Sequence, residues 1–301
     1  MRLYTYENHD GCSNIGIGFS SRPGQIWDQE IFGLSFSDMN ELICGMPLDE
    51  LLAKADIQKA ELSAALDLEN IRVLAPIPHP KQDILCLGIN YAEHAVESAR
   101  FHKDAFMVNQ EKAVYFSKRV QEASGPDAVI PLHKEVTDCV DYEVELGVII
   151  GKDCQNVPRE GLTAQTASQY IYGYTIVNDV SARDLQVDHK QWYFGKSLDG
   201  FAPMGPCIVT ADEIAFPPVL NVTSRINGET RQQSCTDCLI HPIDEIISEL
   251  SQGMTLKAGT IIATGTPAGA GMGFTPPKYL KEGDEVVCEI EGIGILRNIV
   301  K

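Results

Sequence analysis

The sequence predicts an α+β fold in which a mixed, rolled β-sheet domain follows a small N-terminal domain. Short apolar runs of strand length outnumber helical stretches along the chain. They do not alternate strictly with helices, as the strands of a doubly wound parallel sheet would. Residues 75–80 hold three prolines at alternating positions, which favours an extended connector and excludes a helix there. We therefore expect a small accessory domain over residues 1–75 and a larger domain over residues 76–301.

The individual elements follow from apolar periodicity and from glycine positions. In the smaller domain, residues 15–19 are typical of a strand and residues 48–66 of a helix. The larger domain holds apolar runs that we predict to be strands: residues 84–88, 144–150, 171–177 and 260–263. Apolar side chains recur at helical spacing over residues 242–251, which predicts an amphipathic helix. Residues 285–291 and 293–300 are expected to form a hairpin around Gly292.

Charge and composition narrow the class of partner. The chain has 301 residues, 44% hydrophobic and 22% charged, with a formal net charge of −18. Such a surface repels phosphates and anionic lipid heads, so neither nucleic acid nor a membrane is an expected partner. A local cation can still draw an anionic substrate into one cleft.

Cysteine usage and hydropathy indicate a cytoplasmic protein. The nine cysteines are an odd number and are scattered, which favours free thiols over a disulfide framework. We interpret Cys235 and Cys238, a C-x-x-C pair, as ordinary cysteines near a turn, because no second pair or histidine pair completes a zinc site. No apolar run approaches the roughly 20 residues that span a bilayer, and the first residues lack a hydrophobic signal core.

Acidic residues alternate within residues 141–148, D-Y-E-V-E-L-G-V. On a strand, Asp141, Glu143 and Glu145 share one face. Carboxylates so close repel one another unless a cation lies between them, and Mg²⁺ prefers such oxygen ligands. The alternative is a solvated acidic face on an edge strand.

Asp179 directly follows the predicted strand at residues 171–177 and is a candidate third oxygen ligand. The alternative is that Asp179 or Ser181 caps the start of a helix.

Three further positions carry side chains suited to acid–base or binding chemistry. If residues 90–97 turn into a helix, His94 and Glu97 lie at i and i+3 on one face, where the carboxylate can orient the imidazole as a base for water. Lys196, between Gly195 and Ser197, is suited to a substrate carboxylate or an enolate. The turn at residues 263–269 offers hydroxyls and N–H groups to an oxyanion. The alternatives are a surface His–Glu pair, a solvated lysine and a structural turn.

Five motifs in order resemble the fumarylacetoacetate hydrolase family, in its acylpyruvase or 2-hydroxyhepta-2,4-diene-1,7-dioate isomerase-like branch. They cover residues from about 75 to 301: G-x-N-Y-x-x-H-x-x-E, D-Y-E-V-E-L-G-V-I-I-G, G-Y-T-I-V-N-D-V-S-A-R-D-L-Q, G-K-S-x-D-G-F-A-P-M-G-P and I-I-A-T-G-T-P-A-G. The resemblance implies a mixed β-roll or β-sandwich C-terminal domain, a homodimer, and Mg²⁺, Mn²⁺ or Ca²⁺ as the cofactor.

The resemblance also implies a role for each matching residue. The implied metal ligands are Glu143, Glu145 and Asp179. The implied catalytic residues are His94, Glu97 and Lys196. The implied substrate-binding residues are Arg183, Gln186 and Thr266. Residues 98–113 depart from the proline-rich stretch of many relatives, in the region that closes over their substrates.

The expected function is metal-dependent hydrolysis of a C–C bond in a small β-diketo acid such as an acylpyruvate. Its partner is then a small-molecule 2-oxo acid. Two alternatives use the same site: decarboxylation of an oxaloacetate-type acid, and isomerisation or hydration of an unsaturated 2-oxo diacid. A third alternative, from another class, is a non-enzymatic protein that binds a metal or a metabolite.

Overall fold

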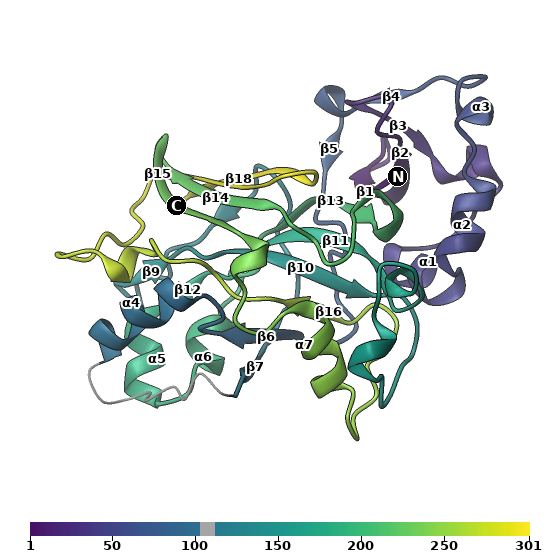
Figure 1. Ribbon diagram of the computed structural model, residues 1–301. Coiled ribbons are helices and arrows are strands. Elements are labelled where there is room, and N and C mark those ends of the chain that lie inside the picture. Colours follow the sequence, from purple (N-terminus) through teal and green to yellow (C-terminus); the bar gives the residue numbers. More distant parts are fainter. Residues whose placement is uncertain (103–111) are drawn as a thin grey trace.

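The computed structural model describes residues 1–102 and 112–301, and two β-sheets dominate it (Figure 1). The larger sheet has eleven strands in the order β4-β3-β2-β1-β13-β11-β10-β16-β6-β7, with β5 paired to β1. The smaller sheet has the order β15-β14-β17-β18-β8. This α+β architecture, rich in strands and with short helices, confirms the predicted fold class.

The strands of the larger sheet lie at the following positions: β1 Arg2–Glu7, β2 Ser13–Gly18, β3 Gln25–Asp28, β4 Leu66–Asp67, β5 Arg72–Val73, β6 Ile84–Gly88, β7 Val114–Lys118, β10 Val144–Ile150, β11 Ile171–Asn178, β13 Met204–Thr210 and β16 Ile261–Ala263. Those of the smaller sheet are β8 Val129–Ile130, β14 Asn221–Ile226, β15 Glu229–Cys235, β17 Glu285–Ile290 and β18 Gly294–Val300. A separate pair joins β9 Val140–Asp141 to β12 Ser181–Ala182. The α-helices are α1 Met39–Gly45, α2 Leu48–Lys54, α3 Ile57–Ala60, α4 Ala92–His102, α5 Arg183–His189, α6 Tyr193–Lys196 and α7 Ile243–Leu250.

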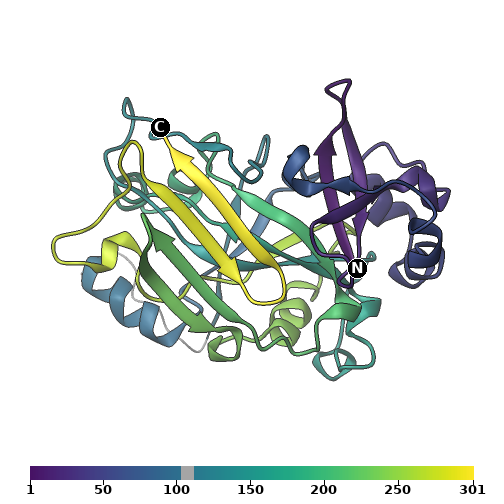
Figure 2. The same ribbon diagram turned by 90° about the horizontal axis from the view of Figure 1, so that it is seen from above.

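Strand β10 lies at the centre of the fold. It pairs antiparallel with β11 on one side and with β16 on the other, and all seven of its residues are buried. The smaller sheet packs on the larger one, with β14 and β17 against β10 and β11 (Figure 2). The alternative of an acidic face on an edge strand is therefore wrong for β10. The apolar residues of β10, interrupted by Glu145 and Gly147, suit a strand that is covered on both faces.

The N-terminal strands extend the larger sheet. β1 pairs antiparallel with β13, Arg2 opposite Val209, and the N-terminal ammonium group donates a 2.7 Å hydrogen bond to Thr210 Oγ1. Residues 1–75 thus share a sheet with the rest of the chain, as the side-by-side β1 and β13 in Figure 1 show. The domain division at residue 75 stays a prediction.

Most predicted elements are confirmed, and one is wrong. Strands β6 and β10, helix α7 and the β17–β18 hairpin all match the sequence pattern. The predicted long helix over residues 48–66 is instead two short helices followed by strand β4. The break occurs at Asp56, whose carboxylate accepts the N–H of Gln58 and so starts a new helix. Among the described residues, no helix is long and apolar enough to cross a membrane.

Candidate active site

Three buried carboxylates meet where β10 and β11 lie side by side. Glu145 belongs to β10, Glu143 precedes it, and Asp179 directly follows β11. The Asp179 N–H donates to the Glu143 carbonyl oxygen at 2.9 Å, which fixes the two chain segments together. One oxygen of each carboxylate lies within 4.8 Å of the others. The structure therefore brings together the three residues that the sequence proposes as metal ligands.

Asp141 does not join these carboxylates, so the predicted row of three acidic residues on one strand face is wrong. The chain leaves β9 after Asp141 and enters β10 only at Val144. Between them the Glu143 N–H donates to Asn178 Oδ1 at 3.0 Å instead of extending one ladder. This break in the strand turns Asp141 toward other partners.

Two cations contact the carboxylate group directly. Lys196 Nζ lies 2.6 Å from Glu143 Oε2 and 2.5 Å from Asp179 Oδ2. Arg183 Nη2 lies 2.6 Å from Glu143 Oε1. Arg183 and Lys196 are both buried, so these pairs form in a medium of low dielectric constant.

A third cation, Lys118, was not foreseen from the sequence. Its side chain is fully buried at the end of β7, and Nζ lies 2.8 Å from Asp179 Oδ1. It also donates to the carbonyl oxygens of Val180 at 2.9 Å and Lys196 at 2.5 Å. Burial, with help from the neighbouring Lys196 charge, lowers the pKa of Lys118. The one signal in the sequence is a lysine that closes a run of aromatic and β-branched residues.

The carboxylates differ in their electrostatic surroundings. Burial acts to raise the pKa of Glu143, but Arg183 and Lys196 outweigh it and lower that pKa to about 2. Burial and the nearby charges of Asp179 and Glu143 raise the pKa of Glu145 well above its ordinary value. Without a further cation, the cluster therefore disfavours the charged form of Glu145.

These residues fit a hard divalent cation. The donors are carboxylate oxygens, which Mg²⁺ and Mn²⁺ prefer. Glu145 accepts a 2.8 Å hydrogen bond from the Gly265 N–H, and a divalent cation bound in the cluster would favour its ionised form. Glu143, Glu145 and Asp179 would hold such an ion.

The predicted His–Glu pair lies on helix α4. His94 Nδ1 is 2.8 Å from Glu97 Oε2, and His94 is 4% exposed. An ionised carboxylate only accepts hydrogen bonds, so Nδ1 carries the hydrogen and Nε2 is left to exchange a proton. The i, i+3 spacing on a helix thus forms the dyad that the sequence predicts.

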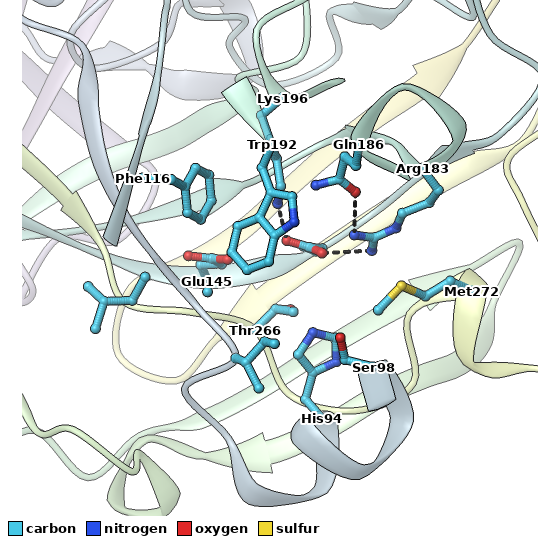
Figure 3. A pocket seen from close by; sticks show the side chains of 14 residues that line it. His94, Ser98, Phe116, Glu145, Arg183, Gln186, Trp192, Lys196, Thr266 and Met272 are labelled. Carbon is cyan, nitrogen blue, oxygen red and sulfur yellow. Dashed lines mark hydrogen bonds and ion pairs between the residues drawn. The ribbon is translucent and has the colours of Figure 1, made fainter. Parts of the chain in front are cut away.

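One pocket joins the dyad to the carboxylates, and one of its walls is apolar (Figure 3). Its polar lining consists of Glu143, Glu145, His94, Ser98, Arg183, Gln186, Lys196 and Thr266. Trp192 and Phe116 form part of the apolar wall, with ring centroids 5.2 Å apart in an edge-to-face arrangement. The Trp192 ring lies against Gly88, where any side chain would overlap it. Such a wall keeps water from a reacting group.

The two predicted substrate-binding residues other than Arg183 also line this pocket, and their neighbours orient them. Thr266 Oγ1 donates to the Val144 carbonyl oxygen at 3.0 Å and accepts from Gln232 at 2.7 Å. Gln186 Oε1 accepts from Arg183 Nη1 at 3.3 Å. All nine predicted site residues are buried or partly buried around one centre.

Comparison with known proteins identifies the family. The family described as "Fumarylacetoacetate (FAA) hydrolase C-terminal" matches residues 83–301. The chain belongs to this family.

Relatives in the fumarylacetoacetate hydrolase family carry several activities in their names. The chain is 45% identical over 231 residues to the oxaloacetate tautomerase YisK of Bacillus subtilis, which covers 77% of this chain and 73% of that protein. It is similar to the structure of a fumarylacetoacetate hydrolase from Exiguobacterium antarcticum, with 38% identity, a TM-score of 0.84, and coverage of 100% of this chain and 99% of the other. A 2-hydroxyhepta-2,4-diene-1,7-dioate isomerase from Mycobacterium marinum matches with 30% identity, a TM-score of 0.70, and coverage of 100% and 98%.

The fumarylacetoacetate hydrolase family thus includes relatives named as tautomerase, hydrolase and isomerase, and the predicted family is confirmed. Part of the segment in which this chain departs from the family pattern, residues 103–111, lies outside the described residues.

Proposed function

We propose that this protein is a divalent-metal-dependent enzyme that forms the enolate of a small 2-oxo diacid, and that it catalyses keto–enol tautomerisation of oxaloacetate. The observation that carries the proposal is one pocket lined by Glu143 and Glu145 of the three-carboxylate cluster and by His94 of the His–Glu dyad. The similarity to a protein named oxaloacetate tautomerase supports the choice of substrate.

The reaction moves one proton from C3 to the C2 oxygen and needs no co-reactant. Glu143, Glu145 and Asp179 would hold a divalent ion, which would supply Lewis-acid stabilisation of the negative charge that develops in the reaction. His94, oriented by Glu97, takes the C3 proton at Nε2 and delivers it to the C2 oxygen. The Lys196 ammonium group stabilises negative charge in the same buried space.

The remaining residues position the substrate. Thr266 and Gln186 offer a hydroxyl and an amide whose orientation is set by their own hydrogen bonds. The Trp192 and Phe116 wall excludes water from the enolate, which would otherwise exchange protons with solvent.

Hydrolysis of an acylpyruvate C–C bond is the second candidate. The dyad supports it, because His94 can also act as the general base that deprotonates a water. Cleavage then consumes one water and releases two acids, one of which leaves as the same kind of enolate.

We further propose that the enzyme acts as a cytoplasmic homodimer.

A turnover screen of metal-stripped protein tests the two candidates. We expect added Mg²⁺ or Mn²⁺ to accelerate the decay of the enol absorbance of oxaloacetate, with no change in mass of the product. Two acids formed from an acylpyruvate would move the assignment to hydrolase, and carbon dioxide released from oxaloacetate would move it to decarboxylase. Absence of metal-dependent turnover on all substrates would contradict the proposal.

The apolar wall predicts the size of the accepted substrate. Trp192→Ala is expected to raise kcat/KM for acylpyruvates with long tails relative to oxaloacetate by about tenfold or more, because each added methylene gains contacts in the enlarged space. Gly88→Ala is expected to do the reverse, since its methyl group pushes the Trp192 ring into the pocket. Tyr193→Ala, at an exposed neighbouring position, is the control. An unchanged preference in Trp192→Ala would show that this wall does not limit the substrate.

A further inference from the structure

The glycine loop Gly269-x-Gly271-x-Gly273 has close neighbours at all three glycines. A side chain at Gly271 would place Cβ 2.6 Å from Asp141 Oδ1, and one at Gly273 would overlap the Glu97 carboxylate. At Gly269, with φ +104°, a side chain would overlap the backbone of Arg231. The glycines therefore let the loop approach two carboxylates at once.

Asp141 holds one side of the loop. Its Oδ1 accepts the Gly271 N–H at 2.7 Å, and its Oδ2 accepts the Met272 N–H at 3.0 Å. Asp141 is fully buried, so these charge-assisted bonds are shielded from water. Met272 itself lines the active-site pocket.

Asp141 also reaches the metal-ligand cluster. Its Oδ2 lies 2.9 Å from Arg183 Nε, and Arg183 Nη2 lies 2.6 Å from Glu143 Oε1. One guanidinium group thus joins Asp141 to a candidate metal ligand, and Figure 3 shows Arg183 between Gln186 and Met272. A fixed fork of donors transmits a displacement of one carboxylate to the other.

Glu97 holds the opposite side of the loop. Its Oε1 accepts the Gly269 N–H at 3.0 Å, while its Oε2 contacts His94 Nδ1. The loop therefore lies between the dyad on α4 and the Asp141–Arg183–Glu143 chain of contacts.

We propose that Asp141 is a positioning residue that couples the His94–Glu97 dyad to the metal-ligand cluster through the glycine loop and Arg183. Asp141 touches no reacting atom in this arrangement. It sets the separation between the proton-transfer group and the carboxylates, on which the proposed function depends. The inference rests on that function for its catalytic consequence but not for its effect on metal binding.

The test compares the Mn²⁺ affinity of Asp141→Asn with that of the wild-type protein. Electron paramagnetic resonance measures the concentration of free Mn²⁺ and so gives the affinity. Asparagine offers one acceptor oxygen and turns an NH₂ group toward donors, so the loop or Arg183 loses its partner. An Arg183 released from Asp141 competes with Mn²⁺ for Glu143. We expect Mn²⁺ affinity to fall about tenfold, as for residues that orient metal ligands. Asp188→Asn, at an exposed position of α5, is the control.

A double-variant cycle tests the link to the dyad. Asp141→Asn and Glu97→Gln are each expected to lower kcat, and their combined loss is expected to be smaller than the product of the two, because both disturb one loop. Unchanged Mn²⁺ affinity in Asp141→Asn, or losses in kcat that multiply, would overturn the coupling. Wild-type protein that binds Mn²⁺ but turns over no 2-oxo acid would contradict the proposed function alone, since the Mn²⁺ comparison still decides the coupling.

Gly273→Ala keeps the proposal testable if Asp141→Asn does not fold. Gly273 lacks a positive φ, so alanine suits its backbone, and the three atoms nearest to the added methyl group all belong to the Glu97 side chain, which must move. We expect a lower kcat and a Mn²⁺ affinity that is weaker by a few-fold, although Gly273 is not a candidate metal ligand. A normal Mn²⁺ affinity in this variant would overturn the coupling.

Discussion

Replacing Glu145 by glutamine is expected to abolish Mn²⁺ binding and metal-dependent turnover while leaving the protein folded. Glu145 contributes an oxygen to the cluster but forms no ion pair among the described residues, and glutamine can still accept the Gly265 N–H. A loss of at least about a thousandfold in kcat/KM is expected, since the Lewis acid is removed. Titration calorimetry with Mn²⁺ and a turnover assay measure the two effects.

The Glu145→Gln variant is also expected to change how the stability of the metal-free protein depends on pH. Burial and the charges of Asp179 and Glu143 raise the folded-state pKa of Glu145 above the ordinary 4.5. The folded protein therefore binds its proton more tightly than the unfolded chain, and stability is lost as the pH rises above 4.5 toward the raised pKa. Glutamine does not ionise, so Glu145→Gln should not lose stability in this way as the pH rises. Its melting temperature at neutral pH should therefore equal or exceed that of the metal-free wild-type protein.

Glu143→Gln provides the contrast. It also removes a ligand, but it leaves Arg183 and Lys196 short of a buried carboxylate, which destabilises a protein by roughly 3–5 kcal/mol. We expect lost turnover here to come with a lower melting temperature. Glu93→Gln, at an exposed position on α4, serves as the common control. Normal Mn²⁺ affinity in both cluster variants would remove the metal hypothesis.

The spacing of residues along the chain was enough to predict single strands, single helices and contacts within one helix. The apolar run at residues 144–150 is a buried strand, and the spacing of His94 and Glu97 puts them in contact once α4 forms. The metal-ligand set came from a family resemblance, because periodicity alone would have included Asp141. The break between β9 and β10 depends on the Asn178 side chain, which is 35 positions away from Glu143. No local period encodes such a contact.

Lys118 is a site residue that the sequence did not predict, because its residue type argues against a buried position. A lysine is almost always solvated, so its identity argues against a place in the centre of a protein. Its burial depends on three acceptors, Asp179 and the carbonyl groups of Val180 and Lys196, which only the folded chain brings together. The sequence contains all of these residues but not their convergence.

Replacing His94 by asparagine is expected to separate proton transfer from metal binding. Asparagine can keep an NH₂ group near the position of Nδ1 and so retain the bond to Glu97, but it has no counterpart of Nε2. A loss of about 10²- to 10⁴-fold in kcat is expected for the removal of a general base. Mn²⁺ affinity should stay within about twofold of wild type, because His94 lies on α4 and none of the three ligands does.

The matched control for this variant is His189→Asn, which removes an exposed imidazole from α5, the helix that carries Arg183 and Gln186. If His189→Asn keeps full turnover and His94→Asn does not, the loss belongs to the dyad and not to histidine content. Lost Mn²⁺ binding in His94→Asn would instead make His94 part of the metal site. Retained turnover would make Lys196 or Glu145, which also line the pocket, the candidate for proton exchange. Burial lowers the pKa of Lys196 and so favours its neutral form, but Asp179 and Glu143 outweigh burial, raise that pKa and keep the ammonium group charged. A lysine held in that state stabilises an enolate but is a poor base, so we expect the full loss on replacement of His94.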